Sequence, residues 1–281
     1  MDSVPFLFGD SVAQLLSPEA LLLLSDRFSA SSWNYPFQLH LTERKTLGLY
    51  LSVSQPTLLF SDVDRRITYS WPQIQKLAWR YVHMDRLEIH DNEEKGNPVA
   101  VDDIGKALKW LPASIHFRAV ILSKFHSDEK LKDIIFGTLG NRPICYLSFR
   151  HSGDESACFL KKQTEKRTLQ SVDFEGKWPE ELEETFIELI AQDQVKCIRF
   201  RNHVFNNVAV LRKCLDRWGE NGTFRFYVKV RYDVLRNTFL QRFGPFFEGV
   251  RQRKTVAHPT QRWYASITRI KRDVILFGQM M

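Results

Sequence analysis

Ser11 has the clearest potential for covalent chemistry, because it follows Gly9 and Asp10 near the start of the chain. A nucleophilic serine needs a general base within hydrogen-bond reach and a further group that orients that base. Histidine is the usual base, yet no histidine of the chain has an aspartate three residues before it; the histidines are His40, His83, His90, His116, His126, His151, His203 and His258. We therefore expect Ser11 to lie at a helix start and to have no catalytic role.

The run Phe8-Gly9-Asp10-Ser11 resembles the first block of GDSL-type esterases, in which the serine is the nucleophile. That resemblance implies an Asp-x-x-His motif near the C-terminus and a Gly-x-Asn-Asp block. The sequence contains neither of them. A GDSL-like esterase is the remote alternative, and we expect a protein that is not an enzyme.

Cofactor and metal motifs are also missing from the sequence. Gly137-x-x-Gly140 follows a helical pattern and lacks the Lys-Ser/Thr pair of a phosphate-binding loop. Neither His-Glu-x-x-His nor paired Cys-x-x-Cys zinc patterns occur. Carboxylates gather at Asp102-Asp103 and over 180–184, where helices are expected to start and acidic residues stabilise the helix dipole. The sequence therefore predicts no cofactor and no metal.

Composition limits the class of protein. The 281 residues are 43% hydrophobic and 26% charged, which is typical of one or two globular domains. Neither a signal peptide nor an apolar stretch of roughly 18 residues is present. The four cysteines form no Cys-x-x-Cys pair and are expected to be free thiols, mostly buried: Cys145, Cys158, Cys197 and Cys214. We expect a cytoplasmic or nuclear protein that does not insert into a membrane.

Positive charge gathers in the C-terminal third. Of the overall net charge of +7, residues 1–194 contribute −6, from 22 basic and 28 acidic residues, and residues 195–281 contribute +13, from 18 and 5. The asymmetry favours an acidic partner for this third, although a solvated basic face without a partner has the same composition. Because no nucleic-acid-binding motif accompanies the charge, nucleic acid is not the expected partner.

An apolar three-point motif repeats along most of the chain. Its copies are Met84-x-x-Leu87-x-Ile89, Phe117-x-x-Val120-x-Leu122, Ile144-x-x-Leu147-x-Phe149, Leu169-x-x-Val172-x-Phe174, Val195-x-x-Ile198-x-Phe200 and a degraded Arg225-x-x-Val228-x-Val230. The middle positions lie 33, 27, 25, 26 and 30 residues apart. The last two apolar positions have the period of a strand with one buried face.

Helical patterns lie between these strands. Apolar residues at helical spacing are Val101, Ile104, Leu108 and Leu111; Leu131, Ile134, Ile135 and Leu139; Leu182, Phe186, Leu189 and Ile190; and Phe205, Val208, Leu211, Leu215 and Trp218. The segment around Phe159 is weaker and predicts a short helix. A strand and a helix repeated every 25 to 33 residues bury their apolar faces only by stacking side by side.

This repeat, over roughly residues 84–243, resembles leucine-rich repeat proteins, whose unit contains Leu-x-x-Leu-x-Leu. The resemblance implies an α/β fold with a parallel sheet on one surface and helices on the other. The asparagine or cysteine that the family places after the last leucine is not regular here. An ordinary doubly wound α/β domain with evenly spaced strands is the alternative.

Shorter elements flank the repeat. Before it we expect a small β-meander and a helix, at Thr46–Val53, Thr57–Phe60, Ile67–Trp71 and Pro72–Tyr81. After it we expect a basic loop over 244–258 and a hairpin of Arg262–Ile270 with Asp273–Phe277. The predicted domains are thus a helical segment at 1–41, the meander and helix at 42–83, the repeat domain at 84–243, and the loop and hairpin at 244–281.

The helical segment shows the spacing of two short helices joined at Ser17-Pro18. Its pattern resembles the F-box, which opens on Leu-Pro and starts its second helix with an Asp/Ser-Pro turn. The matching residues are Val4, Pro5, Phe8, Val12, Leu16, Pro18 and Leu21. Leu7 departs from a position that is often acidic, and Phe28 and Trp33 come one or two residues late. The sequence as a whole is similar to the divergent F-box-like families of nematodes.

The F-box resemblance implies a function. F-box proteins bind the Skp-type adaptor of cullin–RING ubiquitin ligases, and many carry leucine-rich repeats behind the F-box. We therefore expect the substrate-recognition subunit of an SCF-type ligase, with the matching residues contacting the adaptor. The alternatives are a protein-binding repeat scaffold without a ligase link and a helical hairpin that only caps the next domain.

Positions between the apolar strand residues would point to the open face of a stacked sheet. One row is Glu88, Ile121, Ser148, Asp173, Arg199 and Lys229, and the next is His90, Ser123, Arg150, Glu175, Arg201 and Arg231. Both rows become uniformly basic at their last two members. We expect Arg199, Arg201, Lys229 and Arg231 to bind an acidic or phosphorylated protein target, unless they form only a solvated face.

Overall fold

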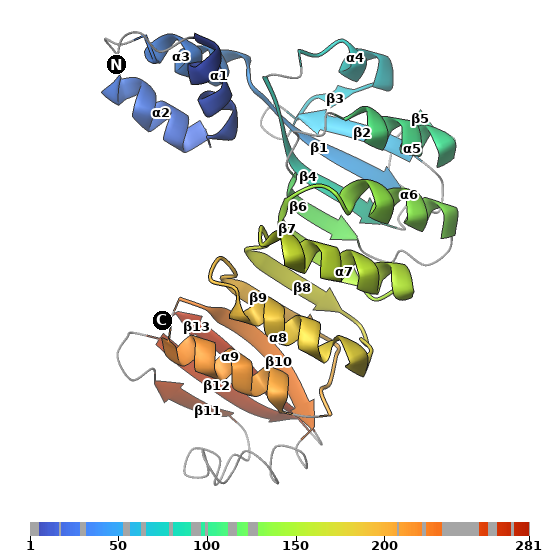
Figure 1. The fold of residues 1–281 in the computed structure, drawn as a ribbon, viewed down its shortest axis with the longest axis vertical. Helices are drawn as coiled ribbons and strands as arrows, with labels where there is room; N and C mark the ends of the chain where they lie inside the picture. The colour runs from blue at the N-terminus through green and yellow to red at the C-terminus, as the bar shows by residue number, and fades with distance from the viewer. Residues whose placement is uncertain are drawn as a thin grey trace. The chain divides into compact units, whose positions relative to one another are not determined.

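The computed structural model contains two compact units, Met1–Glu88 with Asn92–Phe117 and Ile89–Asp91 with Arg118–Met281. Figure 1 shows the elements of each unit. The structure describes residues 6–16, 18–28, 32–52, 57–62, 66–78, 81–90, 97–98, 101–111, 117–122, 129–206, 208–220, 223–231, 253–257, 263–270 and 273–280.

The first unit begins with three short helices, α1 (Phe6–Leu15), α2 (Pro18–Arg27) and α3 (Asn34–Glu43). A small sheet follows in the order β4-β1-β2-β3, with β5 also paired to β2. Its strands are β1 (Lys45–Ser52), β2 (Thr57–Asp62), β3 (Thr68–Tyr69), β4 (Val82–His90) and β5 (Asn97–Pro98). Two more helices complete this unit, α4 (Trp71–Gln75) and α5 (Val101–Trp110).

The expected meander is observed, since β1 pairs antiparallel with β2 and β2 pairs antiparallel with β3. The expected helix over 72–81 is shorter, because α4 ends at Gln75. Its start is fixed by a capping box in which Ser70 and Gln73 satisfy each other's backbone groups. The third helix, α3, has no counterpart among the two expected N-terminal helices.

The second unit is a layer of strands with a layer of helices against it. Its sheet has the order β6-β7-β8-β9-β10-β13-β12-β11. The strands are β6 (Phe117–Leu122), β7 (Ile144–Arg150), β8 (Ser171–Glu175), β9 (Cys197–Arg201), β10 (Arg225–Arg231), β11 (Arg253–Ala257), β12 (Trp263–Ile270) and β13 (Asp273–Met280). The helices are α6 (Glu129–Leu139), α7 (Asp154–Lys166), η2 (Glu180–Leu182), α8 (Glu183–Ala191) and α9 (Ala209–Glu220).

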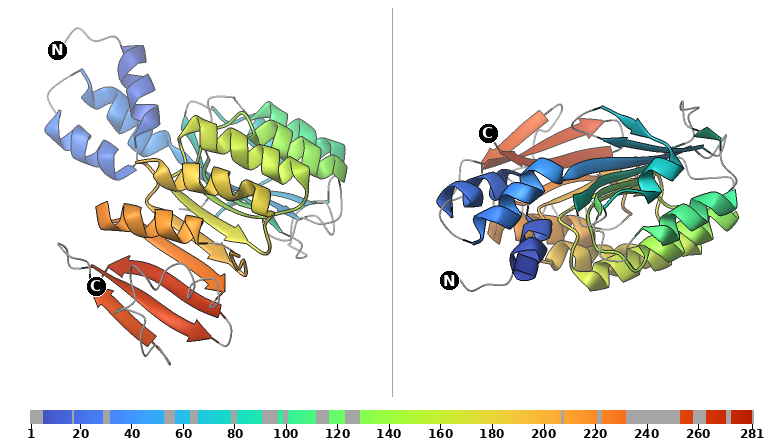
Figure 2. Two further views of the ribbon diagram at one scale, coloured as in Figure 1. Left: turned by 60° about the horizontal axis from the view of Figure 1, so that its bottom comes forward. Right: turned by 90° about the horizontal axis from the view of Figure 1, so that it is seen from above.

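Strands β7 to β10 run parallel to one another, as the strand–helix pattern predicts. Figures 1 and 2 show α6, α7, α8 and α9 side by side on one face of these strands. Right-handed strand–helix–strand connections place every connecting helix on the same side when neighbours are added in one direction. The α/β class with a mostly parallel sheet is therefore confirmed for this unit.

Two details of the second unit differ from expectation. Helix α7 extends over 13 residues, although its apolar pattern indicated only a short helix. The segment expected as a basic loop contains the strand β11, which pairs with β12 and adds a third antiparallel strand to the expected hairpin. Sequence patterns are weak for α7 because its buried positions include the polar residues Ser156, Gln163 and Thr164.

The core of the second unit is a phenylalanine ladder. The third apolar position of three repeat copies is Phe149, Phe174 and Phe200, and these residues are neighbours in the parallel register. Their ring centroids lie 5.8 Å apart for the first pair and 4.9 Å for the second. Phe186 of α8 packs on the last two rings from the helix layer. Burial of such rings supplies the main stabilisation of the repeat.

Buried polar side chains recur along the repeat. Each of them joins one helix to the end of the helix before it. Gln163 donates to the carbonyls of Leu139 at 3.0 Å and Arg142 at 3.1 Å, just at and after the end of α6. Gln192 donates to the carbonyl of Thr164 near the end of α7, at 2.8 Å. Arg217 donates to the carbonyl of Ala191, the last residue of α8, at 3.1 Å. These donors add side-chain hydrogen bonds to carbonyls at helix ends, where Leu139 and Thr164 also accept the backbone N–H of Arg142 and Arg167.

Candidate functional site

Helices α1, α2 and α3 share a small core. Ala13, Leu21 and Phe37 are fully buried, and other apolar residues pack against them: Leu16, Leu24, Phe28, Trp33 and Leu41. The guanidinium of Arg44 donates to the carbonyls of Ala13 and Leu16 at the end of α1. The helices therefore form a packed three-helix segment, in which α3 contacts both of the others.

The run Gly9-Asp10-Ser11 has a structural explanation inside this segment. A Cβ atom at Gly9 would lie 2.9 Å from Pro36 Cγ, so glycine allows α1 and α3 to approach closely. Asp10 Oδ1 lies 3.1 Å from Nε2 of the buried His40. Ser11 Oγ donates to the carbonyl of Leu7, one turn earlier on the same helix, at 2.8 Å. Each residue thus contributes to the packing or hydrogen bonding of α1.

The three-helix segment also exposes large apolar side chains. Six of them define what we call the helical apolar surface: Phe6, Leu7, Phe8, Leu22, Leu23 and Tyr35. Leu7 is 70% exposed, and Phe6 contacts Tyr35 with ring centroids 5.6 Å apart. Ile67 is the one further large apolar residue found exposed among the residues whose side chains are described, and it lies outside these helices. Contiguous exposed apolar side chains mark surfaces that bind partners, and Phe6 with Tyr35 forms such a pair between α1 and α3.

The residues expected to contact an adaptor have different positions in the structure. Phe8 is exposed, Val12 is half-buried, and Pro18 is the first residue of α2. Leu16 packs against the core and Leu21 is fully buried, so their apolar spacing reflects the interior of the segment. Val4 and Pro5 lie outside the described residues. An interface on this segment would therefore use the helical apolar surface and not Leu21.

The open face of the second unit carries the polar rows that the repeat predicts. Ser148 pairs in register with Asp173, and Asp173 pairs with Arg199. Two residues further along, Glu175 pairs in register with Arg201. Since strand residues alternate between faces, these side chains point away from the phenylalanine ladder. The predicted alignment of β7, β8 and β9 is confirmed.

The predicted alignment of β10 is wrong by two residues. Tyr227, and not Lys229, pairs with Arg199. The middle position of the repeat copy in β10 is the buried Phe226, which pairs with Ile198. The sequence pattern had placed Val228 at this position. Lys229 lies two residues beyond Tyr227 on the same face. Arg231 is the last residue of β10, and the structure does not describe its side chain.

Asp173, Arg199 and Arg201 form what we call the arginine–aspartate cluster. Asp173 is 1% exposed although it lies on the open face. Its Oδ2 atom is 2.6 Å from Nη2 of Arg201 and 3.7 Å from Nη1 of Arg199. Burial raises the pKa of Asp173 above its usual value, and the two arginines lower it without offsetting the effect of burial. Two of the four expected basic residues are thus brought together, around a carboxylate.

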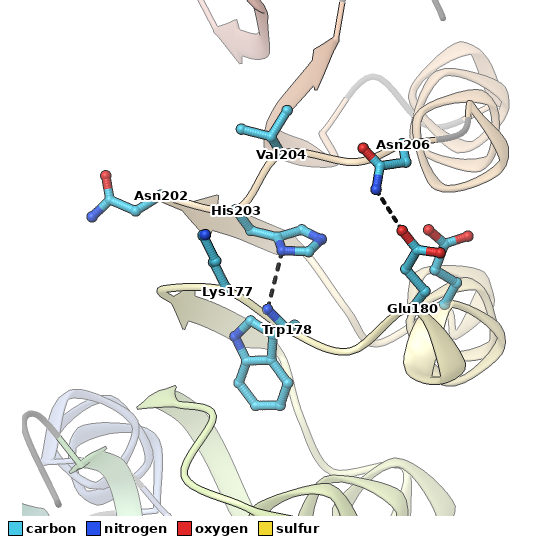
Figure 3. Close-up of a pocket in the computed structure, with 8 residues that line it drawn as sticks. Lys177, Trp178, Glu180, Asn202, His203, Val204 and Asn206 are labelled. Carbon is cyan, nitrogen blue, oxygen red and sulfur yellow. Dashed lines mark hydrogen bonds between the residues drawn. The ribbon is translucent and has the colours of Figure 1, made fainter.

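A pocket of about 290 Å³ lies where the loops after β8 and β9 meet, at the carboxyl ends of these strands (Figure 3). It is lined by Lys177, Trp178, Glu180, Glu183, Asn202, His203, Val204 and Asn206. Ligands of parallel α/β sheets commonly bind at this end of the strands. The described charges at the pocket are one lysine and two glutamates, and no serine or cysteine nucleophile is among the lining residues.

His203 ties the two loops together at this pocket. Its Nδ1 atom accepts a hydrogen bond from the backbone N–H of Trp178 at 3.1 Å, as Figure 3 shows. Burial lowers the pKa of His203 to about 4, so the ring is neutral at physiological pH. Asn206 donates to Glu180 across the same opening. The contacts of the pocket thus join loops of consecutive repeats, with Glu180 close enough to His203 to act on its pKa.

The described residues contain neither a membrane-spanning helix nor a metal-binding group. No helix in that part of the chain is long and apolar enough to cross a membrane. Among the same residues, no group of three or more histidine, cysteine, aspartate or glutamate side chains could hold a metal ion. The described cysteines are free thiols.

Comparison with known proteins gave no match. The chain matches no protein-family model, no curated protein and no solved structure. The geometry of the chain's own residues is therefore the basis for any functional conclusion.

Sequence reasoning overlooked two features of these surfaces. It placed Asp173 in a row with Arg199 but did not pair them, although opposite charges at neighbouring positions of a predicted parallel sheet are a signal for such a contact. It also overlooked Leu22 and Leu23, whose exposure depends on which face of α2 packs inward. Helical spacing predicts Leu21 and Leu24 on the buried side of this helix, and both do pack in the core, so Leu22 and Leu23 are left on the outer side.

Proposed function

We propose that the chain is a protein-binding adaptor, the substrate-recognition subunit of a cullin–RING ubiquitin ligase of the SCF type. In this role the three-helix segment docks on the Skp-type adaptor and the open sheet face of the second unit binds the target. The observation that carries the proposal is the helical apolar surface on a segment that already has its own core. The resemblance of residues 4–33 to an F-box gives the proposed partner its identity.

The physical argument concerns where the apolar residues are. Three helices of ten residues each bury only a small core, with Ala13, Leu21 and Phe37 at its centre. Helices this short are marginal in water without tertiary packing. Exposed residues such as Leu7 and Leu22 add nothing to that packing, and covering them with a partner would remove apolar area from water at about 25 cal/mol per Å². Binding would therefore stabilise the segment as well as anchor it.

The second unit supports the target-binding half of the proposal. Its parallel strands have helices on one face, and the other face presents polar rows at regular spacing. Repeat proteins use such continuous faces to bind other proteins. The pocket at the ends of β8 and β9 holds a histidine that is neutral at physiological pH, and no serine or cysteine nucleophile is among its lining residues, which favours a binding role over an enzyme.

The test is a pull-down of purified Skp-type adaptor with the full-length chain, beside the double variant Leu7→Asp/Leu22→Asp. Both side chains are exposed, so the charges should leave the fold intact and remove apolar anchors from the interface. We expect the wild type to retain the adaptor and the double variant to lose at least about tenfold in affinity, as for interface anchors worth 1.4 kcal/mol or more. Circular dichroism should give the same helix content for both proteins.

Ile67→Asp is the matched control, because Ile67 is 48% exposed in the same unit but outside the three helices. This variant should bind like the wild type. Absence of binding by a well-folded wild type would refute the ligase role and leave a protein-binding repeat scaffold, with the three helices serving another contact. Equal loss in the control and the double variant would show that the helical apolar surface is not the interface.

A further inference from the structure

We propose that the arginine–aspartate cluster binds a side-chain carboxylate in an acidic segment of a protein partner. The inference rests on the proposed use of the open sheet face for target binding, and it adds the chemistry of the target. It concerns Arg199 and Arg201, which are two residues apart on β9 and converge on one buried oxygen of Asp173. This convergence makes them a pair and distinguishes them from scattered surface arginines.

The geometry leaves hydrogen-bond donors available. Each guanidinium has five N–H donors, and Asp173 contacts one terminal nitrogen of Arg199 and one of Arg201. The two arginine side chains are 44% and 52% exposed, whereas the carboxylate beneath them is 1% exposed. Asp173 therefore forms ion pairs with both groups from beneath, and both arginine side chains remain partly exposed. An arginine fork that is fixed before binding loses less entropy when it takes up a carboxylate.

The local charge fits a single carboxylate better than a phosphate or a nucleic acid. With Asp173 ionised, the two arginines and Asp173 sum to +1, and Glu175 lies in register beside Arg201. The negative charge of Glu175 acts on this cluster, since it contributes to raising the pKa of Asp173. A monoanion neutralises the cluster, whereas a phosphate monoester carries about −1.5 to −2 and a nucleic acid would bring further phosphates against Glu175. The cluster is therefore matched to aspartate or glutamate side chains.

The neighbouring strand extends the attraction beyond the cluster. Arg225 is exposed on β10 and pairs in register with Cys197, on the same face as Arg199. Lys229 lies further along that face. The positive charges of these two residues would steer an acidic segment towards the sheet and raise its rate of association. They supply general attraction, whereas Arg199 and Arg201 supply the directed hydrogen bonds.

The experiment measures binding of a blocked peptide of alternating glycine and glutamate to the full-length chain by titration calorimetry at low ionic strength. The same peptide with glutamine in place of glutamate is the neutral comparison. We expect the glutamate peptide to bind and the glutamine peptide to bind at least about tenfold more weakly. Arg199→Gln and Arg201→Gln should each weaken the glutamate peptide by about tenfold or more, as expected for a lost charge-assisted hydrogen bond. Arg201→Lys should also weaken it, because lysine keeps the charge but not the fork.

Arg225→Gln is the matched control, since it removes the same charge from the same face without touching Asp173. It should weaken the peptide less than about threefold. Equal losses in all three glutamine variants would overturn the proposal in favour of a diffuse basic face. Tighter binding of a phosphoserine peptide or of a single-stranded oligonucleotide than of the glutamate peptide would overturn the choice of a carboxylate.

A second readout separates this proposal from the ligase role. The Arg199→Gln and Arg201→Gln chains should still retain the Skp-type adaptor as the wild type does, because the arginines are not on the three helices. Failure of the peptide test with intact adaptor binding would refute the carboxylate site alone. Loss of adaptor binding in these variants would contradict the assignment of the two surfaces to different partners.

Discussion

The three-helix segment and the strand–helix repeat bury their apolar residues to different degrees. In the repeat, Phe149, Phe174 and Phe200 are fully buried, and the large side chains described on its surface are polar. In the three-helix segment, six large apolar side chains stay exposed around a core of three fully buried residues. The described residues of the repeat bury their large apolar side chains, whereas the three helices leave apolar area exposed. The difference indicates where a partner contributes to stability.

The strongest test of the comparison is Phe174→Ala in the phenylalanine ladder. Phe174 contacts Phe149, Phe186, Phe200 and Trp178, so truncation leaves a cavity among rings held by both layers. We expect a loss of about 3–5 kcal/mol in the free energy of unfolding, measured with urea. The phenylalanine-to-leucine change at the same position should cost clearly less. A cost below about 1 kcal/mol for Phe174→Ala would show that the ladder is not the stabilising core.

Leu21→Ala in the core of the three helices should have the next largest effect. Leu21 is fully buried, and the expected loss for such a truncation is about 2–5 kcal/mol. Because the segment has a small core, we expect hydrogen exchange to accelerate in α1, α2 and α3 while amides of β7, β8 and β9 stay protected. The matched control is Leu22→Ala, whose exposed side chain should change stability by less than about 0.5 kcal/mol. Uniform acceleration in both units would contradict the idea that the two regions are stabilised separately.

Gln163→Leu tests the polar part of the repeat. The amide of Gln163 serves the carbonyls of Leu139 and Arg142, and leucine has a similar volume but no donor. Leu139 O keeps the backbone N–H of Arg142 and Arg142 O keeps Lys166 Nζ, so losing the Gln163 bonds should cost about 1 kcal/mol, less than the cavity at Phe174. Gln170→Leu is the control, because Gln170 is exposed and its side chain is not used in this contact. A neutral Gln163→Leu would mean that apolar burial alone holds α6 against α7.

The sequence predicts the repeat well because the repeat depends on short-range periodicity. The apolar pair at the end of each motif, such as Leu147 and Phe149, is sufficient to locate a strand and its buried face. The register of β10 was predicted wrongly because Thr223-x-x-Phe226-x-Val228 and Arg225-x-x-Val228-x-Val230 fit the apolar spacing equally, and the backbone pairs Phe226 with Ile198. Spacing along the chain does not fix which residue lies beside which in the next strand.

The candidate sites could be predicted only in part, because they depend on contacts between distant residues. The basic row was visible in the sequence, but its pairing with Asp173 required the alignment of β8 with β9. On α2, helical spacing correctly predicts Leu21 and Leu24 on the buried side, but their core partner Phe37 belongs to α3, which lies outside the two helices that the sequence predicts. The apolar patterns that predict strands and helices depend on residues close together in the sequence. The two candidate sites depend on tertiary packing between distant residues.

The smallest expected effect concerns Asp173, a carboxyl group that the repeat buries. Burial raises the pKa of this carboxyl in the folded state, so its contribution to stability is present below the unfolded pKa and is lost as the pH rises through the folded pKa. When it is ionised, the buried carboxylate carries a burial cost that Arg199 and Arg201 do not fully offset, and both arginines are partly exposed to solvent. We therefore expect Asp173→Asn to increase the free energy of unfolding at pH 7 by about 1 kcal/mol. The advantage should shrink as the pH falls, because the wild-type carboxyl becomes neutral too.

Urea unfolding of both proteins between pH 4 and 7 measures this difference. A destabilised Asp173→Asn at pH 7 would show instead that the ion pairs outweigh the burial of the charge, and the repeat would then be as well satisfied in its polar rows as it is in its phenylalanine ladder.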